Sequence, residues 1–312
     1  MRNQLYIQFF FKIRKIILIT LFICFRISSS YAADQIQISD TAWRSSTEEA
    51  IRYLNNIQKL SASKYWPNVE PDLFLSNLKT FILSPLKFEE GKSTNFCAYS
   101  AITLVSLYYD PAGFSRFMID LYKNGKAKLG TVNFHPGENI RNEAGLLKYK
   151  GLLDVSPVGQ MWFLCLANHF KGYLNFFNRH FDKGDENTLW ASTNFAKFNR
   201  MLKKLYPLNV HAKGSDLIRP WLTDVPDFLQ EKIRSDFVFL YLNNRLLYRK
   251  NNAKVRFGIP THYVQLLDIH QSGDDKFTII YSGYGTKTLQ EVTPRFLKKI
   301  IFGITWFKIP EK

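Results

Sequence analysis

The stretch FVFLYL at residues 237–242 marks the point where the pattern of the chain changes from helical to extended. All six residues are apolar or aromatic, which is typical of a strand buried on both faces. The turn sequence Ser-Gly-Asp-Asp at 272–275 separates two of the runs that follow it. The C-terminal part is therefore expected to contain further strands at 261–269, 277–281 and 304–309, and a short helix at 294–300.

The chain before this strand is expected to be mostly helical. Its best-defined helix covers 96–109, where apolar residues recur every 3.6 positions from Cys97 onward and Asp110-Pro111 ends the run. Residues 126–141 are expected to form a loop, because they contain Gly130, Pro136 and Gly137. Other helices are expected at 47–60, 72–83, 112–123, 160–177 and 188–205. Helices followed by antiparallel strands indicate an α+β fold rather than alternating βαβ units.

Composition excludes several classes of protein. The 312 residues are 46% hydrophobic and 22% charged, as in folded globular chains. Three cysteines rule out a scaffold held by several disulfides and a zinc site made of four cysteines. The sequence contains no His-x-x-x-His or Cys-x-x-Cys pair, so we expect neither a metal site nor a cofactor.

The first 32 residues are expected to be a signal peptide. A basic N-terminal region ends at Lys15, an apolar run of ten residues covers 16–25, and small residues at Ser30 and Ala32 suit cleavage after Ala32. The protein is therefore expected to be exported, either to a periplasm or to the medium. The alternative is an uncleaved membrane anchor.

The remaining chain is basic. Its 37 basic and 26 acidic residues give a formal charge of +11, which favours association with an anionic cell surface. The basic residues are scattered and no nucleic-acid-binding motif is present, so a specific nucleic-acid partner is not expected.

The segment Asn95-Phe96-Cys97-Ala98-Tyr99-Ser100-Ala101 places a cysteine in the first turn of the best-defined helix. The free N–H groups of a helix N-terminus favour a thiolate and can hold an oxyanion. Two simpler interpretations remain open: Cys97 is a small buried residue of the helix face, or it forms a disulfide with Cys165.

His262 is the candidate general base for this cysteine. The segment Thr261-His262-Tyr263-Val264 puts His262 at the start of an expected strand, directly after Gly258-Ile259-Pro260. A neutral imidazole there can take the proton of the Cys97 thiol and return it to the leaving group.

The order of these segments resembles the papain-like cysteine peptidase superfamily, most closely the bacterial double-glycine (bacteriocin-processing) peptidases. The resemblance covers about 91–125 and 235–309, and implies that Cys97 is the nucleophile and His262 its base. It also implies an Asp or Asn after the strand at 277–281, where this chain has Ser282-Gly283-Tyr284-Gly285. Ser282 is the candidate for that role, and Asn95 is the candidate oxyanion donor in place of the family's glutamine.

The resemblance predicts one papain-like domain over 33–312, with a helical insertion at about 126–234. The expected function is an exported cysteine hydrolase that cleaves an amide of a peptide, a protein or peptidoglycan. Two alternatives remain: an inactive papain-like binding protein, and an exported interaction or immunity-type protein in which Cys97 is merely structural.

Overall fold

Residues 45–87, 89, 94–147, 155–171, 180–244 and 260–308 are described in the computed structural model, and all of them belong to one compact unit, residues 43–312. The expected signal peptide at 1–32 lies outside the described residues. So do residues 172–177 of the helix expected at 160–177, and the described part of that helix ends at Phe170.

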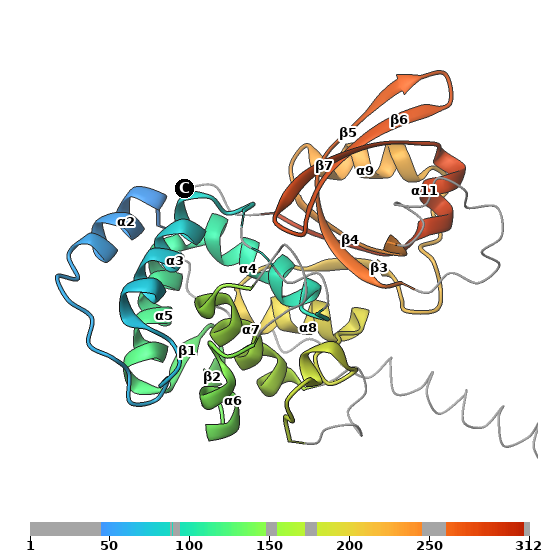
Figure 1. Ribbon diagram of the computed structural model, residues 1–312. Helices are drawn as coiled ribbons and strands as arrows, with labels where there is room; N and C mark the ends of the chain where they lie inside the picture. Colours follow the sequence, from blue (N-terminus) through green and yellow to red (C-terminus); the bar gives the residue numbers. More distant parts are fainter. Residues whose placement is uncertain are drawn as a thin grey trace, which may run out of the picture. The chain divides into compact units, whose positions relative to one another are not determined.

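Strands from the second half of the chain form one six-stranded antiparallel sheet (Figure 1). Its strand order is β3-β8-β4-β5-β6-β7. The strands are β3 (His211–Gly214), β4 (Phe237–Leu242), β5 (His262–Gly273), β6 (Lys276–Gly283), β7 (Thr286–Val292) and β8 (Ile301–Phe307). Three of the four expected strands are confirmed with shifted ends, and β4 matches its expected range. The edge strands β3 and β7 were not predicted. Their residues are mostly exposed, so neither carries a continuous apolar run.

The two faces of the sheet belong to different cores. Phe239 and Tyr241 of β4 pack into the core of the helical part, whereas Val238, Leu240 and Leu242 pack into a second core. Helices α9 (Val225–Ile233) and α11 (Pro294–Ile300) cover this second face. Because side chains alternate along a strand, a strand buried on both faces must be apolar throughout, which explains FVFLYL.

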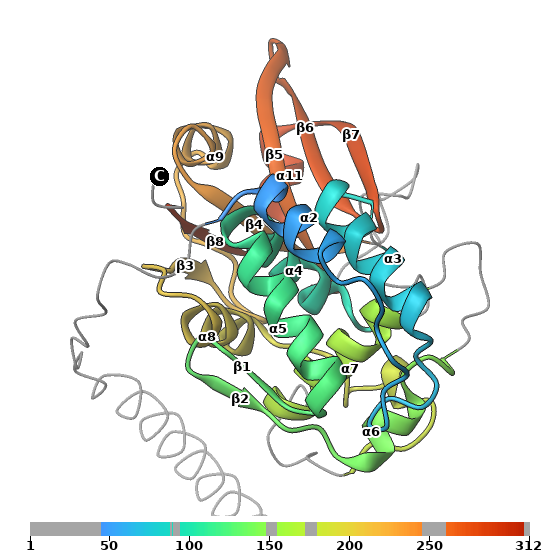
Figure 2. The ribbon, with the colours of Figure 1, turned by 90° about the vertical axis from the view of Figure 1, so that its left-hand side faces the viewer.

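Helices cover the first face (Figure 2). They are α2 (Thr47–Asn55), α3 (Pro71–Leu83), α4 (Cys97–Tyr109), α5 (Pro111–Asn124), α7 (Pro157–Phe170) and α8 (Phe195–Leu205). Helix α4 lies against β5 and also contacts α7 and α8. The expected helices are confirmed in position, although α2 ends five residues early and α8 begins seven residues late. The α+β class is therefore confirmed.

The loop expected at 126–141 is wrong. It contains a hairpin of β1 (Ala127–Leu129) and β2 (Val132–Phe134), followed by α6 (Glu138–Glu143). Gly130 adopts φ 58 at the turn, where an added Cβ would meet the backbone of Leu205. These three-residue strands are too short for the sequence pattern to show. The segment 126–234 is accordingly not wholly helical.

Trp162 of α7 lies at the centre of the helical core and fixes α4. Its ring contacts Phe114, Phe117 and Phe134, and its Nε1 donates to Thr103 Oγ1 of α4 at 2.9 Å. Thr103 is fully buried and donates in turn to the carbonyl oxygen of Tyr99 at 2.7 Å.

Thr103→Val is expected to lower the free energy of unfolding by about 1–3 kcal/mol, because it leaves the buried Trp162 N–H without an acceptor while preserving the side-chain shape. Thr103→Ser, which keeps the hydroxyl, is the matched control. Chemical denaturation measures both variants, and a Val variant as stable as the wild type would contradict the role given to this hydrogen bond.

Candidate active site

Cys97 is the first residue of α4. It is a free thiol and partly exposed, while its neighbour Phe96 is buried and serves as the N-cap without a side-chain hydrogen bond. The loop before α4 is held by the segment that follows α7. The backbone N of Asn95 donates to the carbonyl oxygen of Glu186 at 2.9 Å, and its side-chain Nδ2 donates to the carbonyl oxygen of Thr188 at 2.8 Å. Asn95 thus positions the loop before Cys97 through its backbone and its side-chain amide.

Cys165 lies far deeper than Cys97. It is a free thiol with 1% of its surface exposed, inside α7. Burial raises the pKa of the Cys165 thiol, which keeps it protonated and unreactive. The structure therefore has no disulfide between the two cysteines, and Cys97 is the accessible thiol of the pair.

His262 is the first residue of β5 and pairs with Leu242 of β4. Only 2% of its surface is exposed, and burial lowers the pKa of its imidazole to about 3. The ring lies against Gly283, where an added Cβ would come within 3.1 Å of His262 Nε2 and 3.3 Å of Val264. In this arrangement the imidazole is neutral near pH 7.

Tyr284 covers the imidazole of His262. The two rings are stacked, with centroids 4.4 Å apart and planes 10° from parallel. Tyr284 and Gly285 form the two-residue turn between β6 and β7, and both have positive φ, 52° and 64°. This is the pattern of a type I′ hairpin turn, which usually takes Asn, Asp or Gly. A tyrosine there is sterically unfavourable, and the ring stack and a 3.0 Å hydrogen bond from Asn244 Nδ2 to its hydroxyl hold it.

The turn occupies the place where the resemblance implies an Asp or Asn. Ser282, the candidate for that role, pairs with Gln265 of β5 and lines a pocket on the face that packs against α4. The His262 ring shares the other face with Val264, beside Gly283. Ser282 and His262 therefore belong to opposite faces of the sheet.

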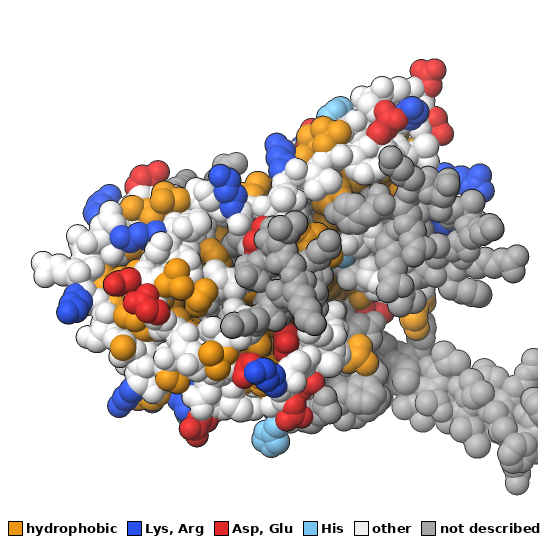
Figure 3. All heavy atoms as spheres, in the orientation of Figure 1, with side chains coloured by type: hydrophobic (Ala, Val, Ile, Leu, Met, Phe, Trp, Pro, Cys, Tyr) orange, Lys and Arg blue, Asp and Glu red, His pale blue; other side chains and the backbone are white. Residues whose placement is uncertain are grey.

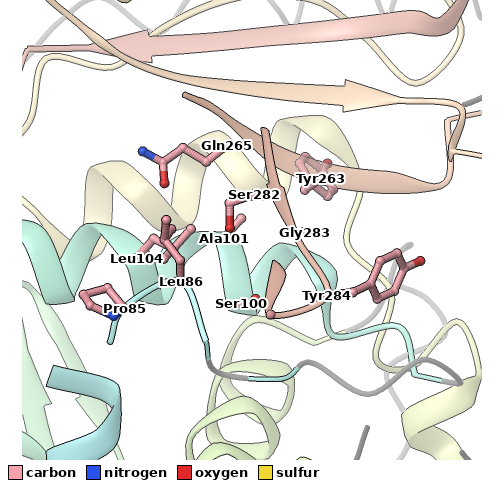
Figure 4. Close-up of a pocket in the computed structure, with 11 residues that line it drawn as sticks. Pro85, Leu86, Ser100, Ala101, Leu104, Tyr263, Gln265, Ser282, Gly283 and Tyr284 are labelled. Carbon is pink, nitrogen blue, oxygen red and sulfur yellow. The ribbon is translucent and has the colours of Figure 1, made fainter. Parts of the chain in front are cut away.

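The pocket lies between α4 and the ends of β5 and β6 (Figure 4). It has room for about one water molecule. Gln265 points into it with 6% of its surface exposed, and its Oε1 has no hydrogen-bond partner. The lining residues are Pro85, Leu86, Ser100, Ala101, Leu104, Tyr263, Gln265, Ser282, Gly283, Tyr284 and Gly285.

Glu89 brings a second buried acceptor to the rim of this pocket. Its carboxylate lies where a Cβ on Gly285 would be, and its Oε2 is buried without a hydrogen-bond partner. Burial raises the pKa of the Glu89 carboxyl. Two acceptors at one pocket suit a donor such as the N–H of a peptide bond.

Tyr284 belongs both to the pocket and to the surroundings of His262. It lines the pocket together with Ser100, which is one helical turn after Cys97, and it stacks on His262. The ring of His262 itself shares the face of Val264, opposite the face of the sheet that packs against α4 and carries the pocket. Neither Tyr284 nor Gln265 was predicted as a site residue from the sequence. The signals were a Gly-Tyr-Gly turn and a glutamine within a buried strand.

Other titratable groups lie elsewhere. Asp268 and His270 form an exposed pair on β5, with Oδ2 and Nδ1 3.0 Å apart. Among the residues that the structure describes, no group of three or more His, Cys, Asp or Glu side chains could hold a metal ion, and no helix is long and apolar enough to cross a membrane.

Tyr284→Ala is expected to raise the pKa of His262 from about 3 toward its ordinary value near 6.5, because it opens the ring to water. The measurement is the pH titration of the His262 ring proton by NMR. Tyr284→Phe, which keeps the ring, is the control and should leave the pKa low. A His262 ring that stays neutral down to pH 4 in the alanine variant would show that Tyr284 is not its cover.

Comparisons with known proteins give no match: no protein-family model, no curated protein and no solved structure is similar to this chain.

Proposed function

We propose that this protein is a cysteine hydrolase. In it Cys97 attacks an amide carbonyl, and His262 transfers the thiol proton to the leaving amine. The observation that supports the proposal is that Cys97 and His262 begin two elements that pack against each other. A partly exposed free thiol begins α4, α4 packs on β5, and β5 begins with His262. The roles given to Cys97 and His262 are those that the resemblance to papain-like peptidases implies.

The chemistry follows from the ends of these two elements. The N–H groups of the first turn of α4 favour the Cys97 thiolate and stabilise the oxyanion formed on attack. The imidazole of His262 takes the thiol proton and gives it to the leaving amine, which leaves an acyl group on sulfur. Water then hydrolyses this thioester and frees Cys97. The substrate class is an amide of a peptide, a protein or peptidoglycan.

The resting state is not ready for this step. An imidazole with a pKa of about 3 is a poor base for a thiol whose ordinary pKa is near 8.5. Tyr284 causes part of that mismatch, since its ring adds to the burial of His262. We propose that a substrate which moves Tyr284 away hydrates His262 and brings the two pKa values closer together.

The test is a search for thiol-dependent hydrolysis. The full chain is incubated with a mixture of fluorescent peptides and with purified peptidoglycan, and products are identified by mass spectrometry. We expect cleavage that disappears after alkylation of Cys97. No cleavage, together with no acyl adduct on Cys97 from an activated ester, would contradict the proposal.

A binding protein of the same fold is the second candidate, and specific observations favour it. The pocket has room for about one water molecule, and Tyr284 covers His262. In that case Gln265 and Glu89 would accept from a single N–H group of a peptide that lies over the mouth of this pocket, without turnover. Peptide binding that Gln265→Leu weakens and Cys97→Ala leaves unchanged would identify this function.

A further inference from the structure

The segment between β3 and α9 exposes three large apolar side chains. Leu217 is 84% exposed, Ile218 73% and Trp221 97%, more than any other large hydrophobic residue that the structure describes. Single exposed hydrophobic side chains are scattered over the face shown in Figure 3 and carry no inference by themselves. Three of them within five residues form an apolar patch of the kind that marks an interaction site.

Both ends of the segment are anchored to the folded unit. At its start, Gly214 pairs with Gly303 of β8 and has φ 99, where an added Cβ would meet the carbonyl oxygen of Phe302. At its end, Leu222 and Val225 are buried in the second core. The exposed residues therefore belong to a fixed protrusion.

Ser215 turns the apolar residues outward. Its backbone N donates to Ile218 O at 2.9 Å, and its Oγ accepts from the backbone N of Leu217 at 3.2 Å and of Ile218 at 2.8 Å. The Ser215 hydroxyl therefore holds the backbone of this turn, and the side chains of Leu217 and Ile218 remain exposed to water.

The base of the protrusion is basic. Arg219 Nε donates to Lys299 O at 2.9 Å, which places the guanidinium beside the last turn of α11, where Lys298 and Lys299 lie. The nearest acids in sequence have internal partners: Asp216 accepts from Tyr241 Oη at 3.2 Å, and Asp224 caps α9. An apolar tip above Arg and Lys side chains matches the surface of an anionic bilayer, because lysine and arginine are attracted to its headgroups and tryptophan prefers its interface.

We propose that residues 217–221 insert into the headgroup region of an anionic lipid membrane and dock the protein there. Trp221, Leu217 and Ile218 enter the interface, while Arg219 and Lys299 contact lipid phosphates. This surface is independent of the Cys97 site, so either proposal can fail without the other.

The test uses the full chain with vesicles of phosphatidylcholine alone or with phosphatidylglycerol. Brominated lipids report the depth of tryptophan, and the difference between the wild type and Trp221→Phe isolates Trp221. This local signal is needed because the apolar run at 16–25 can itself bind lipid. We expect Trp221 to be quenched in anionic vesicles, and to be released by high salt.

Leu217→Ser/Ile218→Ser is expected to weaken the Trp221 quenching so that about tenfold more anionic lipid is needed. Leu289→Ser is the matched control, since Leu289 is also exposed, at 66%, but lies alone on β7. Trp221 that stays open to acrylamide in the presence of anionic vesicles would overturn the proposal. Self-association in sedimentation that the double variant abolishes, without quenching by lipid, would also overturn it and identify a protein interface instead.

Discussion

A chain with Cys97→Ala is expected to lose hydrolysis altogether, with a fall in rate on the order of 10³-fold or more. The reason is chemical. Without the sulfur no acyl-enzyme can form, and His262 has no thiol from which to take a proton. The measurement is the burst of product released from an activated ester, with the acyl adduct followed by intact mass. The fold should survive, since Cys97 is partly exposed and the change in volume is small.

Cys165→Ala is the matched control for this experiment. Cys165 is the other free thiol that the structure describes, and it is buried within α7. We expect a small loss of stability and an unchanged burst. Equal bursts from the Cys97→Ala chain and the wild type would show that the nucleophile is not Cys97.

The second large effect concerns stability against pH. The folded-state pKa of His262, about 3, lies below the value near 6.5 expected for an unfolded chain. Between these values the unfolded chain binds a proton that the folded chain excludes, so the stability contributed by neutral His262 is lost as pH falls. At pH 5 the loss is about 2 kcal/mol relative to neutral pH, on the order of 1.4 kcal/mol for each pH unit below 6.5.

His262→Gln is the comparison chain, because carboxylates elsewhere in the chain titrate in the same range. Glutamine keeps a polar side chain of similar size that cannot be protonated. Denaturation midpoints measured from pH 7 to pH 4.5 should converge for the two chains as the pH falls. Parallel curves would contradict the buried, neutral state of His262. His169, whose pKa is also lowered by burial, contributes equally to both chains.

Much of the fold was predictable from local sequence. The range of β4 is the six-residue apolar run, and α4 begins within one residue of its expected start. The hairpin of β1 and β2 was not predictable, because its strands have three residues each and are stabilised through contacts such as Thr131 N to Lys204 O. Strand β7 was missed because its alternation of exposed residues carries no core signal.

The site was predictable only in part. The helical period of apolar residues and the position of the apolar strand place Cys97 and His262 at element starts, and this needs nothing beyond sequence. The stack of Tyr284 on His262 depends on a left-handed turn that tyrosine seldom adopts, so local preference argues against it. The burial that lowers the pKa of His262 likewise arises from the packing of β5 against Gly283, a contact between strands that no sequence motif encodes.

We propose that His262 activates Cys97 and that the ring of Tyr284 prevents this by keeping His262 buried. The most direct measurement is the rate of Cys97 alkylation by iodoacetamide at pH 7 in four chains: the wild type, Tyr284→Ala, His262→Ala and the double variant. We predict that Tyr284→Ala raises the rate roughly tenfold, as for a thiol pKa lowered by about one unit, and that His262→Ala removes this gain. The same gain in the absence of His262, or the rate of an ordinary free thiol in all four chains, would contradict the account.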